Sequence, residues 1–518
     1  MFAALSIACS KDALETFPST GVRKEVVYGD VDNARSALNA TLTSLGTNSW
    51  GSGYSAPTAF GHAVASITAD AMAEDYVLAE QGNGWMWVIY SYDFNSWYDD
   101  PRIQVTTLWN CYYTTINSAN EMIAVADVLT ESPEGTHLLG QAYAVRALSY
   151  FMLAQFYARA YYYHPDDLCV PVYLEPSDAT TKGAPRSTNK EVYEDVIMPD
   201  INKAIELLSA AESAGAERAD ILEISCAVAQ GIKARVALTM HNWSEAYTAA
   251  EAALAAYSGN EVMTPAQITT GMNTLSAMPS VMWGMVVTAD NYGMYASYLA
   301  QMDANHDGYA TSARRCCTSF LWDQLGENDA RRAWWRGDFN NANYESSGWN
   351  IKYCQTKFTF QGTTWFGDEV HMRAEEMLLI AAEAYCQAGN DAQARVFLKK
   401  LMAQRDPDYT RADSKSGTAL GTLTAGSDGA EMTGSLLEEI LIQRRIELWG
   451  EYGRLHDIKR LHQGFKRVES DEEDNPNFNP VALIPKYKTT DPDTFDWVYL
   501  IPQMELDGNP NIEQRVIE

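Results

Sequence analysis

The sequence predicts a mainly α-helical protein built on about four tetratricopeptide-like helical hairpins, with a loop-rich, aromatic-rich insertion side and few short strands. Apolar residues recur at three- and four-residue steps over 105–128 and 137–160, which indicates long helices. Small residues recur at matching points of two distant helical segments. Between those two segments, residues 261–364 are dominated by Gly, Asn, Asp and aromatic residues, which is typical of loops.

The repeated segments supply the main evidence for hairpins. One contains Ala234 and Ala246, and the other contains Ala382 and Ala394, so the two alanines are separated by the same interval in both. Alanines at these points let the two helices of a hairpin approach closely. We therefore expect both segments to be helix-turn-helix hairpins of one curved scaffold.

Further elements follow from local signals along the chain. Asp30 is a suitable N-cap for a helix that begins at Val31, and a second helix is expected over 60–72. The segment that begins at Glu191 has helical periodicity after a Pro-containing turn. The apolar run around Trp283 is short and strand-like.

We expect a short tether over 1–27 and a single body over 28–518. The regions of that body are a repeat scaffold, mainly 105–257 and 370–462, and a loop-rich ligand side, mainly 46–102 and 261–364.

Charge and cysteine content exclude several classes of function. The formal net charge is −30, and the 38 Lys and Arg residues are scattered, so a nucleic-acid-binding face is not expected. The eight cysteines form no C-x-x-C pair and no zinc-type cluster with histidine. Adjacent Cys316 and Cys317 cannot easily bond to each other, so each is expected to be a buried thiol or to pair elsewhere.

The first residues indicate attachment to a membrane. The apolar segment Met1 to Ala8 ends in a small residue directly before Cys9, as lipoprotein signal peptidase requires, and is too short to span a bilayer. A serine and charged residues follow Cys9. We therefore expect lipidation of Cys9 and a membrane attachment through lipid alone.

Aromatic residues in loops are the candidate ligand contacts. Trp and Tyr offer flat apolar faces to the C–H groups of a sugar ring, while amides and carboxylates bind its hydroxyls. For each single ring, packing in the core is the competing interpretation. The candidate ligand-binding residues are Trp85, Trp87, Tyr90, Tyr92, Asn95, Trp97, Tyr292, Trp322, Trp334 and Trp335.

One segment resembles the start of a calcium-binding loop. Asp303, Asn305 and Asp307 stand at alternate positions before Gly308, but Arg314 stands where the bidentate Glu belongs. Calcium binding therefore needs a carboxylate from elsewhere, and the alternative is a polar loop at the ligand groove. No other cofactor is expected.

Catalytic motifs are absent from the sequence, which has no G-x-S-x-G, H-E-x-x-H, phosphate loop or dinucleotide fingerprint. We therefore do not expect an enzyme. A glycoside hydrolase needs only two carboxylates and is the lesser alternative, with Asp99 and Asp100 beside Trp97 as the suspected pair.

Several motifs together resemble the SusD/RagB family. They are the charged helix at 436–461, the tail at 499–514, the segment at 107–123, and Arg373, Glu375, Glu376 and Glu383 in the segment that begins at Val370. The charged groups of 436–461 are spaced to pair on the helix surface, and we interpret them as stabilising, not catalytic. Gln443 and the final EQRV depart modestly from the family pattern.

The resemblance implies a surface lipoprotein of the outer membrane in Bacteroidetes-type bacteria. Such proteins capture nutrients for a SusC-like TonB-dependent transporter. For this chain the resemblance implies oligosaccharide or polysaccharide binding on the loop-rich side. Peptide capture, as in the RagB branch, is the alternative.

Overall fold

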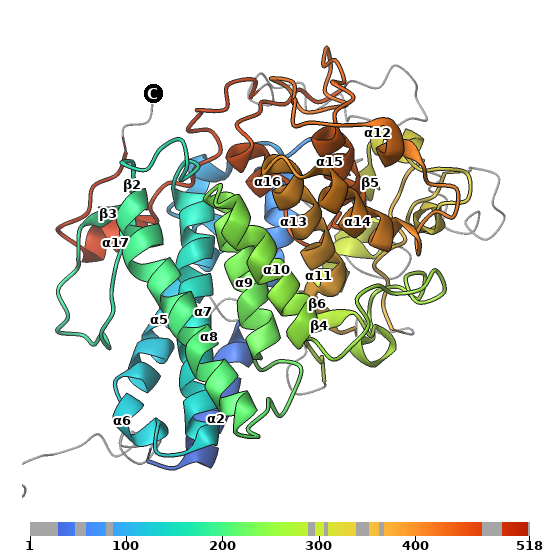
Figure 1. Cartoon of the computed structure of the whole chain (residues 1–518). Coiled ribbons are helices and arrows are strands. Elements are labelled where there is room, and N and C mark those ends of the chain that lie inside the picture. Colours follow the sequence, from blue (N-terminus) through green and yellow to red (C-terminus); the bar gives the residue numbers. More distant parts are fainter. Residues whose placement is uncertain are drawn as a thin grey trace, which may run out of the picture.

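Helices packed side by side make up the left and centre of the molecule (Figure 1). The computed structural model describes residues 29–46, 58–78, 86–288, 296–304, 309–337, 352–361, 367–468 and 489–515. Helix α5 packs on α7, α7 on α8, α9 on α10, α10 on α13, and α13 on both α14 and α15. The bounds of these helices are Gln104–Ile123 (α5), Pro133–Tyr157 (α7), Met198–Ser213 (α8), Cys226–Thr239 (α9), Trp243–Ala256 (α10), Ala374–Gln387 (α13), Asp391–Met402 (α14) and Leu436–Glu447 (α15).

The two predicted hairpins are confirmed as α9–α10 and α13–α14. Ala234, Ala246, Ala382 and Ala394 are all fully buried, as close helix packing requires. Gly389 turns the second hairpin with φ of 80°, a left-handed conformation that glycine adopts without strain. The fold class is therefore mainly α, with a tetratricopeptide-like arrangement of helical hairpins.

Local sequence signals predicted the positions of the first two helices correctly. Helix α2 (Val31–Ser44) begins after Asp30, whose carboxylate accepts hydrogen bonds from the backbone N–H groups of Asp32 and Asn33. The helix expected over 60–72 is α3 (Ala63–Ala71). A π-helical stretch, η3 (Glu191–Ile197), precedes α8, and Pro199 stands in the first turn of α8, where a missing N–H is tolerated.

Short elements complete the described chain. The helices are α4 (Trp87–Tyr90), η2 (Phe94–Trp97), α6 (Ala126–Leu129), η4 (Leu275–Ala277), α11 (Tyr298–Met302), η5 (Tyr309–Thr311), α12 (Ser319–Asp323), η6 (Ala330–Trp334), η8 (Arg411–Ser414), α16 (Arg454–Arg460) and α17 (Gln503–Gly508). The strands are β1 (Tyr76–Leu78), β2 (Leu168–Pro171), β3 (Arg186–Thr188), β4 (Val281–Met285), β5 (Arg315–Cys317) and β6 (Glu369–Arg373).

The strands pair in three antiparallel ribbons: β1 with β5, β2 with β3, and β4 with β6. The strand-like run around Trp283 is therefore strand β4. Loops and short helices dominate the right-hand side of Figure 1, where α12 and β5 lie, and α17 with the β2–β3 ribbon lies at the left edge.

Nearly all charged residues of 436–461 are buried, and Asp457 and Arg460 pair three residues apart as expected, while other pairs reach beyond this segment. Glu447 is fully buried and accepts hydrogen bonds from Arg405 at 2.9 Å and Arg373 at 3.2 Å. Arg445 reaches Asp75 at 2.6 Å. Such pairs join segments that are distant in the sequence, because a guanidinium enclosed by the core needs a carboxylate wherever the fold can supply one.

Candidate functional site

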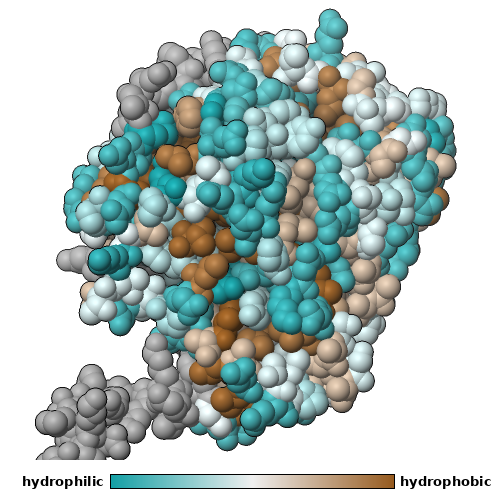
Figure 2. Space-filling model, turned by 60° about the vertical axis from the view of Figure 1, so that its left-hand side comes forward, coloured by the Kyte–Doolittle hydropathy of each residue, from teal (hydrophilic) through white to brown (hydrophobic). Residues whose placement is uncertain are grey.

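A pocket of about 720 Å³ opens between α5, α17 and the loop that joins β2 to β3. This loop, residues 172–185, is called the strap below. Figure 2 turns this side of the molecule forward and shows apolar residues near the middle of the face, with hydrophilic residues around them. The volume lies in the range of small-molecule sites, about 300–1,000 Å³.

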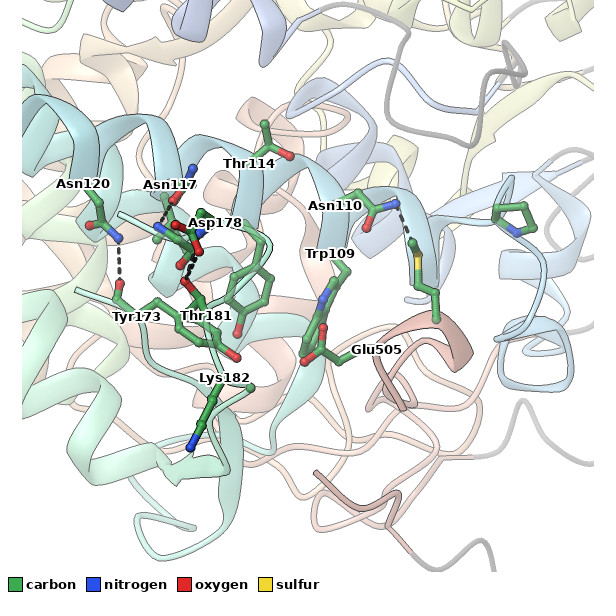
Figure 3. Close-up of a pocket in the computed structure, with 16 residues that line it drawn as sticks. Trp109, Asn110, Thr114, Asn117, Asn120, Tyr173, Asp178, Thr181, Lys182 and Glu505 are labelled. Carbon is green, nitrogen blue, oxygen red and sulfur yellow. Dashed lines mark hydrogen bonds between the residues drawn. The ribbon is translucent and has the colours of Figure 1, made fainter. Parts of the chain in front are cut away.

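One face of α5 forms the floor of the pocket. Trp109, Tyr113, Asn117 and Asn120 follow one another at three- and four-residue steps, so they share a side of the helix. The Trp109 and Tyr113 rings lie 4.7 Å apart between their centroids. In Figure 3 Trp109 projects from α5 into the space beside Glu505 of α17.

Amide side chains of α5 hold the strap in place (Figure 3). Asn120 donates from Nδ2 to the carbonyl oxygens of Tyr173 and Glu175, both at 3.0 Å. Asn117 accepts from the backbone N–H of Ser177 at 2.7 Å. The wall of the pocket is therefore fixed by side chains that also line it.

Buried groups behind the strap reinforce it. Arg146 donates to Asn120 Oδ1 at 2.7 Å and makes a two-point ion pair with Asp200. The Tyr150 hydroxyl donates to the carbonyl oxygen of Tyr173 at 2.9 Å and accepts from its N–H at 2.7 Å. These bonds fix the Tyr173 backbone, and the hydroxyl of its ring accepts from the N–H of Ala184 at 2.9 Å.

Helix α17 and the tail after it form the opposite wall. Met504 and Glu505 line the pocket. Asn509 donates to the Ala184 carbonyl at 2.9 Å, and Asn511 donates to the Gly183 carbonyl at 2.7 Å. The tail and the strap, which are remote in sequence, are therefore fastened to each other across one end of the pocket.

The lining suits a polyhydroxylated ligand. Two half-buried rings, Tyr113 and Tyr173, supply apolar surface, with the nearly buried Trp109 beside them. Donors and acceptors come from Asn110, Thr181, Lys182 and Glu505. Burial raises the pKa of the Tyr113 phenol well above its usual value, so its hydroxyl keeps its proton and donates to the Pro171 carbonyl at 2.7 Å. Apolar faces with amide and charged groups around them match the two surfaces of a sugar.

Three of the sequence-predicted ligand residues are accessible. Trp97 is 48% exposed, and Pro101 of the same segment lines the pocket. The next residue, Tyr98, accepts a hydrogen bond from the N–H of Gln503 in α17, so this segment adjoins the pocket wall. Trp87 and Trp322 are half-buried, and Trp322 in α12 lies on the opposite side of Figure 1 from α17.

The remaining described candidates pack into the protein. Tyr90, Tyr92, Trp334 and Trp335 are at most 5% exposed and do not line the pocket, so these rings belong to the core and we no longer propose them as ligand contacts. Asn95 fastens the chain near the C-terminus, donating to the Val498 carbonyl and accepting from the Leu500 N–H. Core packing, the competing interpretation, holds for the four rings because aromatic rings bury the most apolar area, whereas Asn95 is half-buried.

Five other predicted residues lie outside the described chain, and Asp303 lies within it. Cys9, Trp85, Tyr292, Asn305 and Asp307 fall outside it. Asp303 is fully buried and accepts from the N–H of Phe360 at 2.7 Å. Within the described residues, no three His, Cys, Asp or Glu side chains gather as ligands for a metal.

The surroundings of Asp100, one of the suspected hydrolase pair, do not suit a general acid. Asp100 forms an ion pair with Arg102 at 2.7 Å, and the hydrogen bond from that side chain lowers the pKa of Asp100. A general acid in glycoside hydrolysis needs a raised pKa instead.

Sequence reasoning missed the pocket residues of α5. The signal was present, because Trp109, Tyr113, Asn117 and Asn120 place rings and amides on one helical face where a core-facing stripe is usually aliphatic. The strap and α17 carried no comparable signal, since only the fold brings them to α5.

Comparisons with known proteins give the family. A SusD-like family described as starch-binding and associating with the outer membrane matches residues 42–220. The SusD family that includes RagB matches residues 301–517. A comparison with curated protein sequences gives no match. Among the described residues, no helix has both the length and the apolar character needed to cross a membrane.

Solved structures share the fold over nearly the whole chain. A SusD-like carbohydrate binding protein from Bacteroides vulgatus is 24% identical, with a TM-score of 0.74 over 93% of this chain and 97% of that one. A SusD superfamily protein from Bacteroides thetaiotaomicron is 20% identical, with a TM-score of 0.70 over 94% and 100%. Surface glycan-binding protein A from Bacteroides uniformis is 18% identical, with a TM-score of 0.63 over 94% and 99%. The helical scaffold, the two matches along the sequence and these structures together show that the chain belongs to the SusD-like family.

Proposed function

We propose that this protein is a cell-surface lipoprotein that captures an oligosaccharide in the pocket between α5, the strap and α17. The observation that carries the proposal is the lining of that pocket, where three rings and several amide and charged groups surround about 720 Å³. Supporting it, the matching SusD-like family is described as starch-binding, and two proteins of the same fold are described as carbohydrate- or glycan-binding. Binding without turnover is the proposed activity.

The captured glycan passes, in this proposal, to a SusC-like TonB-dependent transporter of the outer membrane. Association of the family with the outer membrane supports this location. Lipidated Cys9 is the proposed anchor. A Cys9→Ser variant is expected to leave the membrane fraction while binding glycan unchanged, which fractionation and calorimetry measure together.

Calorimetry on the chain without its first nine residues tests the ligand. The panel contains neutral, acidic and amino-sugar oligosaccharides together with peptide pools, and each mixture is checked for cleavage products. Saturable glycan binding without cleavage supports the proposal. Peptide binding alone would move the assignment to peptide capture, and cleavage lost in Asp99→Asn or Asp100→Asn would establish a hydrolase.

Paired variants test the place of binding. Asn110→Ala with Lys182→Ala alters two pocket residues that are not in the core, and we expect about tenfold weaker binding or more, since each lost hydrogen bond contributes about 1 kcal/mol. Trp97→Ala and Trp322→Ala are the comparison, at accessible rings outside the pocket lining. Loss of binding in the Trp322→Ala variant alone would place the ligand on the loop-rich side instead.

A further inference from the structure

Two cysteines face each other across neighbouring extended segments on the loop-rich side. Strand β5 pairs with β1 along one edge, and along its other edge Cys316 forms an antiparallel bridge with Cys354. Both side chains are buried, at 0% and 1% exposure. Within the described strands and bridges, these are the two cysteines placed opposite each other.

The backbone hydrogen bonds define the kind of pair. The N–H of Cys317 donates to the Tyr353 carbonyl at 3.1 Å, and the N–H of Gln355 donates to the Arg315 carbonyl at 2.8 Å. These bonds flank Cys316 and Cys354, which therefore form a non-hydrogen-bonded antiparallel pair. Such a pair brings the Cα atoms to about 4.5 Å and the side chains to one face of the ribbon. A disulfide accepts Cα separations of about 4.4–6.8 Å.

Cys317 is the competitor for Cys354, and its direction decides against it. Successive side chains of a strand point to opposite faces, so Cys316 and Cys317 cannot both face Cys354. Across β1, Cys317 lies opposite Tyr76 and Cys316 opposite Val77. The strand register therefore makes Cys316, and not Cys317, the partner of Cys354.

We propose that Cys316 and Cys354 form a disulfide in the mature protein. The inference rests on the proposed location outside the cytoplasm, because disulfides persist in oxidising compartments. Two thiols lose two protons and two electrons. The electrons pass to a disulfide-bearing oxidant: one cysteine thiolate attacks the oxidant and releases one thiolate, and the second cysteine resolves the mixed disulfide and releases the other.

The bond would fasten the loop-rich side to the scaffold. It closes the loop 317–353, which contains α12 and η6. Beyond Cys354, the ammonium of Lys357 donates to the carbonyl oxygens of Glu447 and Trp449 at 2.8 and 2.9 Å, so this stretch is already tied to the end of α15. The cross-link would extend that attachment to β5.

Peptide mapping of the full chain tests the pairing. The purified protein is equilibrated with excess oxidised glutathione, its remaining thiols are blocked with N-ethylmaleimide in denaturant, and it is digested with trypsin. Cleavage after Arg315, Arg331, Lys352 and Lys357 gives peptides 316–331 and 353–357. We expect them joined, two hydrogens lighter than their sum, and separated by reductant.

Variants decide which cysteine is bonded. The joined peptide should persist in Cys317→Ser and disappear in Cys316→Ser and Cys354→Ser. Reductant should lower the Tm of the wild type and of Cys317→Ser by about 3 °C and leave that of Cys354→Ser unchanged. Full N-ethylmaleimide labelling of both cysteines after oxidation, or a joined peptide that survives in Cys316→Ser, would overturn the proposal.

Glycan binding, measured on the same oxidised and reduced samples, separates this inference from the proposed function. Binding without the cross-link would overturn the disulfide and leave glycan capture standing. A cross-link without glycan binding would support the disulfide and count against glycan capture.

Discussion

At the residue scale, buried charge pairs fix the geometry of the molecule. Burial alone would raise the pKa of Glu447, but Arg405 and Arg373 lower it below its usual value. A third guanidinium, that of Arg331, lies 3.5 Å away. The carboxylate is therefore ionised and enclosed, and its removal takes one buried partner from each of the three arginines, which keep Glu375, Glu451 or Asp329.

Glu447→Gln should accordingly destabilise the protein by about 3–5 kcal/mol, the usual cost of breaking a buried ion pair. The measurement is the urea dependence of unfolding. The matched control is Lys203→Ala, which removes an exposed pair with Glu206 at 2.8 Å and should cost about 0–1 kcal/mol. Equal effects of the two substitutions would mean that burial does not set the strength of these pairs.

A second prediction at this scale concerns pH. Burial, with a contribution from Arg235, lowers the pKa of His371 to about 3. The unfolded chain, with the ordinary value near 6.5, binds this proton more readily. Stability associated with His371 is therefore fully present above pH 6.5 and is lost as the pH falls toward 3. Unfolding free energies measured from pH 7 to pH 4 should show this loss, and His371→Phe should make it smaller.

Glu369, opposite Met285 in the β4–β6 ribbon, has the reverse behaviour. Burial raises its pKa to about 8, so its contribution is present below pH 4.5 and is lost as the pH rises through 8. Glu369→Gln should flatten the stability profile between pH 4.5 and pH 8 and leave it as it is below pH 4.5. A profile that changes only below pH 4.5 would assign the titration to another group.

At the element scale, the pocket depends on contact between the strap and the C-terminal tail. A Cβ at Gly183 would lie 2.1 Å from Asn509 Oδ1, so alanine there must displace the amide that fastens the tail. We expect Gly183→Ala to weaken glycan binding several-fold and to lower thermal stability, because the displaced Asn509 amide is buried and hydrogen-bonded. Calorimetry and thermal unfolding on the same sample measure both.

Gly508→Ala is the control for that substitution. It lies in α17, and no heavy atom is within 4 Å of its added Cβ. It should leave affinity unchanged. Weaker binding in this variant would show that α17 responds to any added side chain, and that the contact at Gly183 is not specific.

Elements were predicted from the sequence better than contacts were. Helices with clear periodicity or a cap, such as α2 and α5, begin within one residue of the predicted start, because these signals reside in neighbouring residues. Tyr90 and Trp334 look like loop aromatics in the sequence, and only the tertiary fold decides that they face the core. Asn509 and Gly183 are far apart in the sequence and meet only in the folded protein, so no local pattern could predict that wall of the pocket.

At the scale of the whole molecule, the scaffold, the loop-rich side and the pocket have separate roles. Paired helices support α5, and α5 carries the floor of the pocket. The C-terminal segment first runs through the buried ion pairs of α15 and then reaches the pocket as α17 (Figure 1). Of the sequence motifs that indicated the family, the charged segment 436–461 lies in the scaffold, while 107–123 and 499–514 contribute the floor and one wall of the pocket.

The most direct test is a crystal structure of the protein with the tightest-binding glycan of the panel. We predict sugar rings between α5 and the strap, with one ring against Tyr113 or Tyr173 and hydroxyls bonded to Asn110, Lys182 or Glu505. A glycan bound at Trp322 or elsewhere on the loop-rich side, with the pocket holding only solvent, would contradict this prediction.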